Sequence, residues 1–107
     1  MLSAFLLNSC ERLDPLSVTE SHDGTAVIMD VLATRSGDRI ICVSRTSSSR
    51  CTRENADVIV ASVTKIEDVK VRWADYEPDV VTVSAARGEF VRSPNKALNG
   101  SVTIEYR

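Results

Sequence analysis

The sequence predicts an all-β fold, mainly antiparallel, in which six to eight short strands form a small sandwich or an incomplete barrel with little helix. Three observations lead to this prediction. Runs of β-branched residues recur along the chain, and such residues favour strands. Several runs alternate apolar and polar side chains with the two-residue period of a strand. Turn-forming residues such as Gly, Pro and Asn separate the runs.

The composition is that of a folded protein. The chain has 107 residues, of which 43% are hydrophobic and 26% charged. This length is enough for one domain with a packed core and too short for two. The net charge is −2, so the field of the whole molecule will not draw it to nucleic acid or anionic lipid. No apolar run approaches the ~18 residues of a membrane-spanning helix.

The first half of the chain contains two buried strands and a third apolar segment. Strands are expected at Thr25–Ala33 and Arg39–Ser44, because they contain the continuous apolar runs Ala26–Met29 and Ile40–Val43, which are typical of strands buried on both faces. The turn Ser36-Gly37-Asp38 joins them as a hairpin, because Gly supplies the positive φ that a tight turn requires. Asp57–Lys65 is also rich in Val and Ile. Its periodicity leaves helix or strand open, and β-branching favours strand.

The second half alternates more clearly. In Val69–Trp73 the apolar residues occupy one face and the basic residues the other, and Val81 and Val83 repeat the pattern after the turn Glu77-Pro78-Asp79. One face of these strands is therefore expected to be solvated.

The chain closes with a hairpin. A short strand is expected at Gly88–Val91, and Ser93-Pro94-Asn95 ends it. Asn99-Gly100 is the strongest hairpin dipeptide in the sequence. It precedes Val102–Tyr106, whose strict alternation predicts the last strand.

The N-terminal segment has a different character. Leu2–Leu7 is apolar apart from Ser3, and Leu7-Asn8-Ser9-Cys10 resembles the lipobox of bacterial lipoprotein precursors. The turn Ser21-His22-Asp23-Gly24 before a Val-rich strand adds a resemblance to small periplasmic lipoproteins of Gram-negative bacteria. Because no Lys or Arg precedes the apolar stretch, we expect Met1 to be internal to a longer signal peptide.

The resemblance implies a domain organisation. Residues 1–9 would be the remnant of a signal peptide, truncated at its start, and the thiol of Cys10 would carry the lipid. Residues 10–23 would form a lipidated tether with a short edge strand at Leu16-Ser17-Val18. Residues 24–107 would form a single β-rich domain.

The cysteine count agrees with export. There are three cysteines, and lipidation of Cys10 leaves Cys42 and Cys51 as a pair that a Ser-rich turn can bring together as a disulfide. In a reducing cytosol the same residues would be free thiols. Two cysteines without further ligands make half a zinc site at best. We therefore expect no metal and no cofactor.

An arginine-rich window is the main charge feature. Between residues 35 and 53 the only acidic residue is Asp38, which gives a local charge of +4 and leaves −6 for the rest of the chain. Arginine binds phosphate or carboxylate bidentately, so an anionic envelope ligand or an envelope protein is a candidate partner. Nucleic acid is not expected, because the window holds no aromatic residue for base stacking. The favoured alternative is a solvated hairpin whose charges protect a sheet edge. The five arginines are Arg35, Arg39, Arg45, Arg50 and Arg53.

The sequence gives little support for catalysis. His22 is the only histidine and lies in the expected tether, where a turn residue is the simpler interpretation. The acidic pairs Glu67-Asp68 and Asp75 with Glu77 lack the spacing of a calcium loop and are expected to be solvated turns. Trp73 and Tyr76 are candidates for an interface, with the core as the simpler place for both.

The sequence as a whole favours a lipid-anchored envelope protein that faces the periplasm as a non-catalytic binding or structural module. Glu11 and Arg12 are not the usual inner-membrane retention pair of lipoproteins, which favours the outer membrane. The alternative is a cytoplasmic interaction or regulatory domain in which Leu2–Leu7 packs into the core.

Overall fold

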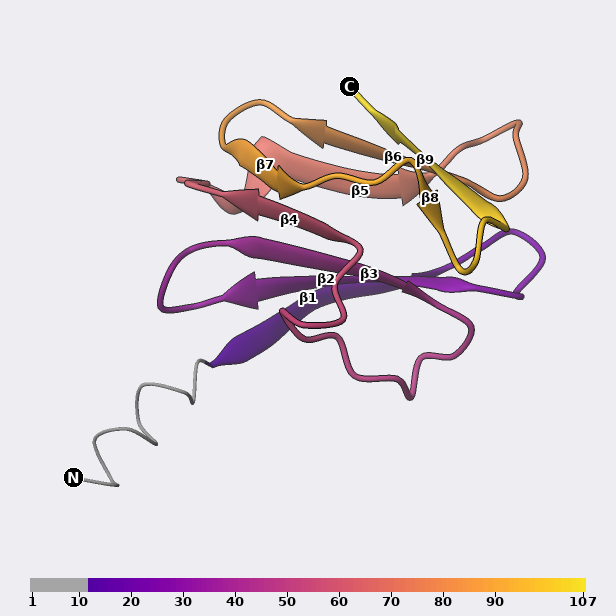
Figure 1. The fold of residues 1–107 in the computed structure, drawn as a ribbon, viewed down its shortest axis with the longest axis horizontal. Coiled ribbons are helices and arrows are strands. Elements are labelled where there is room, and N and C mark those ends of the chain that lie inside the picture. The colour runs from indigo at the N-terminus through magenta and orange to yellow at the C-terminus, as the bar shows by residue number, and fades with distance from the viewer. Residues whose placement is uncertain (1–11) are drawn as a thin grey trace.

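The computed structural model describes residues 12–107, which form two β-sheets packed face to face (Figure 1). The all-β prediction is confirmed, with one three-residue 3₁₀ helix, η1, as the only helix of the described residues. The elements are β1 (Leu13–Glu20), β2 (Val27–Ala33), β3 (Arg39–Ser44), β4 (Val58–Ala61), η1 (Ile66–Asp68), β5 (Val69–Trp73), β6 (Val80–Ala85), β7 (Glu89–Arg92), β8 (Lys96–Ala97) and β9 (Val102–Tyr106).

The first sheet, sheet A, has the strand order β1-β2-β3-β4-β7, and the second, sheet B, has the order β5-β6-β9-β8. All neighbouring strands pair antiparallel except β6 and β9, which are parallel. The chain crosses to sheet B through η1 and returns to sheet A for β7. No helix in the described part of the chain is long and apolar enough to cross a membrane.

The main core lies between the sheets. Sheet A contributes alternate residues such as Ile28, Ile41 and Val60, and sheet B contributes residues such as Val81 and Ile104. The polar residues of sheet B alternate with these and face solvent, as the sequence predicts for β5 and β6.

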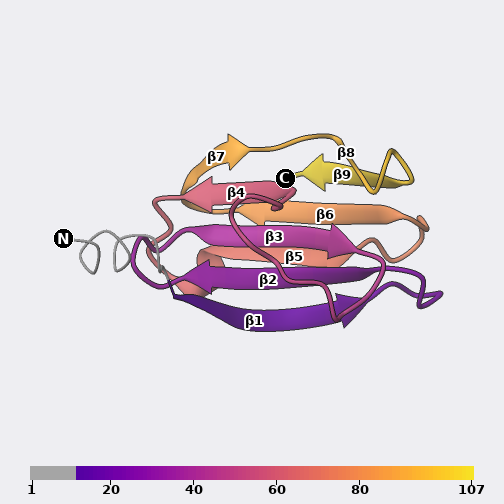
Figure 2. The ribbon, with the colours of Figure 1, turned by 60° about the horizontal axis from the view of Figure 1, so that its bottom comes forward.

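A second, smaller core explains why β2 and β3 are apolar on both faces. Met29, Val31 and Ile40 pack on the outer face of sheet A together with Ala56. The segment 45–57, which connects β3 to β4, crosses this face and covers it (Figure 2). Because β2 and β3 are each buried from both sides, both strands contain consecutive apolar residues.

The predicted disulfide Cys42–Cys51 is present and fixes this covering segment to β3, with 5.7 Å between the two Cα atoms. The Cys51 sulfur also lies 3.9 Å from the carbonyl oxygen of Ile40. This is a packing contact, because a disulfide sulfur has no proton to donate. Arg92 donates to the carbonyl oxygen of Ala56 at 2.9 Å and ties the far end of the segment to β7.

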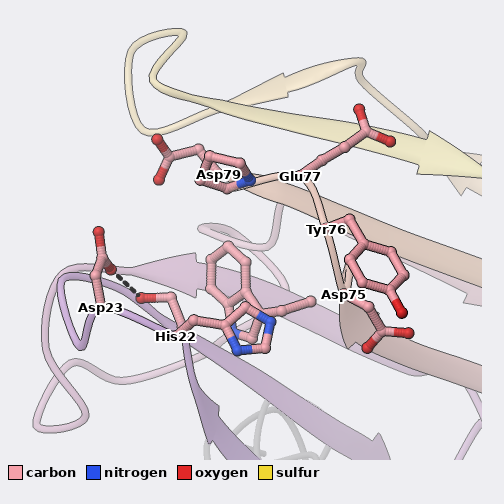
Figure 3. Close-up of a pocket in the computed structure, with 9 residues that line it drawn as sticks. His22, Asp23, Asp75, Tyr76, Glu77 and Asp79 are labelled. Carbon is pink, nitrogen blue, oxygen red and sulfur yellow. Dashed lines mark hydrogen bonds between the residues drawn. The ribbon is translucent and has the colours of Figure 1, made fainter.

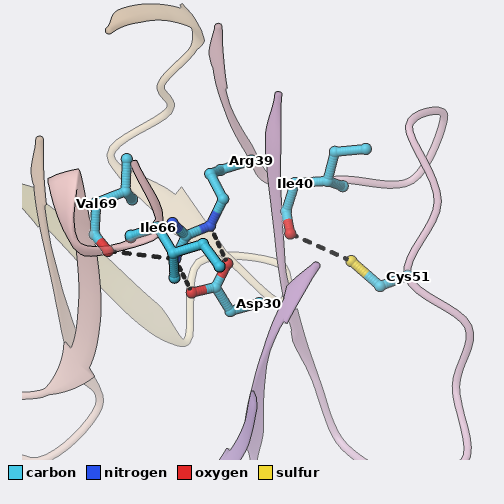
Figure 4. Close-up of polar contacts among 6 residues, drawn as sticks. All are labelled: Asp30, Arg39, Ile40, Cys51, Ile66 and Val69. Atoms are coloured by element: carbon cyan, nitrogen blue, oxygen red, sulfur yellow. Dashed lines mark hydrogen bonds and ion pairs between the residues drawn. The ribbon is translucent and has the colours of Figure 1, made fainter. Parts of the chain in front are cut away.

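An ion pair is buried inside the sandwich. Arg39 donates to Asp30 through Nε at 2.9 Å and through Nη2 at 2.5 Å. The same guanidinium donates to the carbonyl oxygens of Ile66 in η1 and Val69 in sheet B (Figure 4). Arg39 therefore connects the two sheets where η1 leads into β5.

The structure extends the fold toward the N-terminus. Leu13–Glu20 is a full edge strand paired with β2, and a register shift separates Pro15 from Ser17. The prediction that residues 10–23 are a tether is therefore wrong for most of that range, and the β domain begins at Leu13 instead of Gly24. The apolar contact of Leu13 with the outer core of sheet A explains the extension. Residues 1–9 and Cys10 lie outside the described residues.

The strand count is nine in the described chain, one more than the sequence suggests. The two-residue strand β8 was not expected, because two residues are too short to show a period. The turns follow the prediction. Gly37 has φ +79°, and Asn99 and Gly100 have φ +56° and +88° in the β8–β9 hairpin.

Candidate functional site

The five arginines of the basic window do not form one surface. Arg35 lies in the turn before β3 and Arg45 follows its end, so the two are at opposite ends of the sandwich. Arg45 donates to the Ser101 hydroxyl at 2.9 Å, and Arg53 pairs with Asp38 at 2.9 Å.

Arg39 is removed from the candidate anion site altogether. Its side chain is 3% exposed and is paired with Asp30. The reason is strand alternation, because Arg39 shares the inner face of β3 with Ile41 and Val43. Of the five, Arg35, Arg45 and Arg50 lie in exposed turns or loops. The combined anion site expected from Arg35 to Arg53 is therefore not formed.

A cavity of about 240 Å³ lies instead between the β1–β2 turn and the β5–β6 turn (Figure 3). Both turns are at the end of the sandwich opposite to the start of β1 (Figure 2). The lining residues come from two stretches that are far apart in the sequence. They are Ser21, His22, Asp23, Trp73, Asp75, Tyr76, Glu77, Pro78 and Asp79.

Two hydrogen bonds fix the aromatic part of the cavity. The Trp73 indole N–H donates to the carbonyl oxygen of Thr19 at 3.0 Å, and the residue is only 6% exposed. His22 Nε2 donates to the carbonyl oxygen of Ala74 at 3.1 Å. A carbonyl can only accept, so this bond places a proton on Nε2. Both contacts connect sheet A to sheet B at the cavity.

The cavity is strongly acidic. Its lining contains four carboxylates and no Lys or Arg. Asp23 accepts from the Thr25 hydroxyl at 2.7 Å and from the Ser21 hydroxyl at 2.8 Å. The bond from the Thr25 side chain, followed by those from Ser21 and the Thr25 amide, lowers the pKa of Asp23. This carboxylate therefore stays charged at neutral pH.

The other three carboxylates lie on the β5–β6 turn. Asp75 is 3.2 Å from Arg72, which approaches from the solvated face of β5. Glu77 and Asp79 have no ion-pair partner among the described residues. Both residues are exposed, and Figure 3 shows their side chains on the segment that follows Tyr76.

Among the described residues, no nucleophilic side chain is hydrogen-bonded to His22. The ring of His22 bonds a backbone carbonyl, and the Ser21 hydroxyl donates to Asp23. Within residues 12–107, no three His, Cys, Asp or Glu side chains are arranged to hold a metal ion.

A second depression of about 410 Å³ lies on the other side of the β5–β6 turn, on the outer face of sheet B. Its lining has three basic residues, Lys70, Arg72 and Arg107, and two acidic ones at the turn, Asp75 and Glu77, so it carries a small excess of positive charge. Thr82 and Ser84 add two hydroxyls. The β5–β6 turn contributes to both depressions, and Tyr76 lines each of them.

Sequence reasoning did not bring these residues together. It treated His22 as part of a tether and Glu77-Pro78-Asp79 as a solvated turn. His22 and Ala74 are separated by 52 positions in the sequence, so no local pattern reveals their contact. The available signal was the gathering of acidic and aromatic residues in both turns. Trp73 is buried, as the simpler interpretation predicts, whereas Tyr76 is 96% exposed and does not belong to the core.

Comparison with known proteins gives no relative. No protein-family model matches the chain, and neither the curated proteins nor the solved structures contain a significant match.

Proposed function

We propose that the protein is a non-catalytic binding module anchored to the bacterial envelope by a lipid on Cys10 and facing the periplasm. The observation that carries the proposal is the position of the cavity relative to the start of the strand framework. The framework begins at Leu13, and the cavity lies at the other end of β1.

The distances support a defined orientation. Three residues lead from Cys10 to Leu13, so a lipid on Cys10 would keep this end of the sandwich within about 10 Å of the membrane surface. The eight residues of β1 would then allow the β1–β2 turn to lie up to about 25 Å farther away. An anchored chain would thus present the acidic cavity to partners in the periplasm.

The disulfide supports the compartment. Cys42 and Cys51 are bonded, and structural disulfides persist in oxidising compartments such as the periplasm. The lipobox-like segment Leu7-Asn8-Ser9-Cys10 supports the anchor from the sequence. Lipidation of Cys10 would leave the chain with no unpaired thiol, since it has three cysteines. More than one acyl chain would make the anchoring stable.

The test is intact mass spectrometry and cell fractionation of the protein expressed with its native upstream DNA in a Gram-negative host. We expect a membrane-associated species that begins at Cys10, heavier by acyl groups and lighter by two protons for the Cys42–Cys51 bond. The variant Cys10→Ala is the matched control and should lose the acyl mass and the membrane association. A soluble, full-length species with three titratable thiols would overturn the proposal and support the cytoplasmic interaction domain.

Crosslinking in cells tests the binding role. We expect the lipidated protein to capture a partner in stoichiometric amount, and the variant Tyr76→Ala to lose it, because Tyr76 is the most exposed large side chain at the cavity. Equal capture by Tyr76→Ala and the wild type would show that this end of the molecule is not the binding end.

A further inference from the structure

The acidic cavity and the basic depression meet at the β5–β6 turn, and we propose that together they form one docking surface for a protein partner. The partner is a segment that carries a cationic and an acidic side chain close together. This inference rests on the binding role proposed above and names its ligand chemistry. It does not depend on the lipid anchor.

The cavity selects an organic cation. Its lining combines the aromatic rings of His22, Trp73 and Tyr76 with four carboxylates. The Trp73 N–H is already bonded to Thr19, so its ring offers a ligand only apolar and π contacts. Aromatic faces attract cations within about 6 Å of the ring centre. The carboxylates do not converge as metal ligands in the described chain, so a guanidinium or ammonium group suits the cavity better than a metal ion.

The basic depression selects the opposite charge. Lys70 is opposite Ser84 in the pairing of β5 with β6, and Arg107 follows Tyr106, the partner of Val83 on β9. One row across β5, β6 and the residue after β9 therefore carries a cation, a hydroxyl and a second cation, Arg107, which lies 3.7 Å from Glu105. Within the described chain, Lys70 and Ser84 make no side-chain hydrogen bond or ion pair. Both are available to a carboxylate.

Tyr76 lies between the two halves. It is 96% exposed and lines both depressions, so no packing against residues 12–107 accounts for its position. Exposed tyrosines surrounded by polar groups are frequent centres of protein interfaces. A partner segment that covers Tyr76 would place neighbouring side chains over each half. The opposite charges on the two sides of the turn would fix its direction, because reversing the segment would pair like charges.

Trp73 is the only tryptophan of the chain, so its fluorescence reports on the cavity directly. We would titrate the full chain with four blocked tripeptides, Arg-Ala-Glu, Arg-Ala-Ala, Ala-Ala-Glu and Ala-Ala-Ala. We expect Arg-Ala-Glu to bind most tightly. Loss of either charge should weaken binding about 2- to 5-fold, as for solvent-exposed ion pairs. Identical titration curves for all four peptides would overturn the proposal.

Variants separate the two halves. Glu77→Gln combined with Asp79→Asn should weaken both Arg peptides. Lys70→Gln should remove the advantage of Arg-Ala-Glu over Arg-Ala-Ala and leave the Arg-Ala-Ala affinity unchanged. Glu67→Gln and Arg35→Gln, which change exposed charges at the opposite end of the sandwich, should have no effect.

Two outcomes would contradict the assignment. If Lys70→Gln keeps the preference for the Glu peptide, the basic row does not take part. If the opposite-end variants weaken binding as much as the cavity variants, the effect is only the net charge of the molecule. Failure of all peptides alongside capture of a partner by the lipidated protein would overturn the docking surface and leave the proposed function standing.

Discussion

Arg39 and Asp30 form a bidentate ion pair inside the sandwich, with side chains 3% and 6% exposed. The pair lies on the inner face of sheet A, and the remaining donors of Arg39 bind the carbonyl oxygens of Ile66 and Val69. A buried charge without its partner is far more costly than a buried pair.

This relationship predicts a specific mutational pattern. Asp30→Ala should lower the free energy of unfolding by about 3–5 kcal/mol, because it leaves the Arg39 charge buried and unpaired. The double variant Asp30→Leu, Arg39→Met should lose less than the single variant, since no buried charge remains. Urea denaturation of the two variants and the wild type measures both values. A double variant less stable than Asp30→Ala would show that the bonds from Arg39 to sheet B matter more than the charge balance.

Reduction of the disulfide should destabilise the domain without changing the order of its strands. The bond closes a loop with a sequence separation of 9, for which the loss of chain entropy in the unfolded state corresponds to about 2–3 kcal/mol. The double variant Cys42→Ser, Cys51→Ser should show the same loss in urea denaturation, and hydrogen exchange should increase first in the covering segment 45–57. Unchanged stability in the variant would mean that the outer core holds this segment without the bond.

Gly88 should be the least replaceable glycine. Its φ is +113°, and a Cβ added there would lie 2.8 Å from both the Ala61 carbonyl oxygen and Val60 Cγ1. Gly88→Ala should therefore cost roughly 2–4 kcal/mol through strain and overpacking. Gly24→Ala is the matched control, because Gly24 has φ +73° but open space around it. It should cost only the left-handed backbone penalty of about 1–2 kcal/mol. Thermal or urea unfolding would compare the two, and equal losses would contradict the steric account.

Tyr106 should make stability fall at high pH. Burial, and then the negative charge of Asp57, raise the pKa of Tyr106 to about 12, and its hydroxyl donates to the carbonyl oxygen of Pro94 at 2.5 Å. The folded state therefore holds this proton more tightly than the unfolded state, whose tyrosine has a pKa of about 10. The contribution is fully present below pH ~10 and is lost as the pH rises toward ~12.

The titration can be observed directly. The chain has two tyrosines, so in Tyr76→Phe the phenolate absorbance reports Tyr106 alone. We expect a midpoint near 12. A midpoint near the ordinary value would contradict the burial of this hydroxyl.

Much of the strand framework could be predicted from the sequence. Three strands have the bounds that the sequence predicts, namely Arg39–Ser44, Val69–Trp73 and Val102–Tyr106. In the last two the apolar alternation matches one buried face, and Asn99-Gly100 forms the expected hairpin. The pairing of Cys42 with Cys51 could also be predicted, because the short Ser-rich turn between them limits the distance between the two cysteines. These features depend on side-chain periodicity and on turn residues, and both involve only a few consecutive positions of the chain.

Only the tertiary structure decided how these strands are assembled and where the candidate site lies. From the sequence alone, Arg39 is expected on the surface. The pairing of β2 with β3 places it on the inner face of sheet A beside Asp30. The parallel pairing of β6 with β9 and the contact of His22 with Ala74 join segments separated by many residues, and no local pattern encodes such contacts. The sequence determined which segments extend and which faces are apolar, because those depend on neighbouring residues. Sheet packing decided which charged residues are buried, paired or gathered around a cavity, because that depends on which distant strands meet.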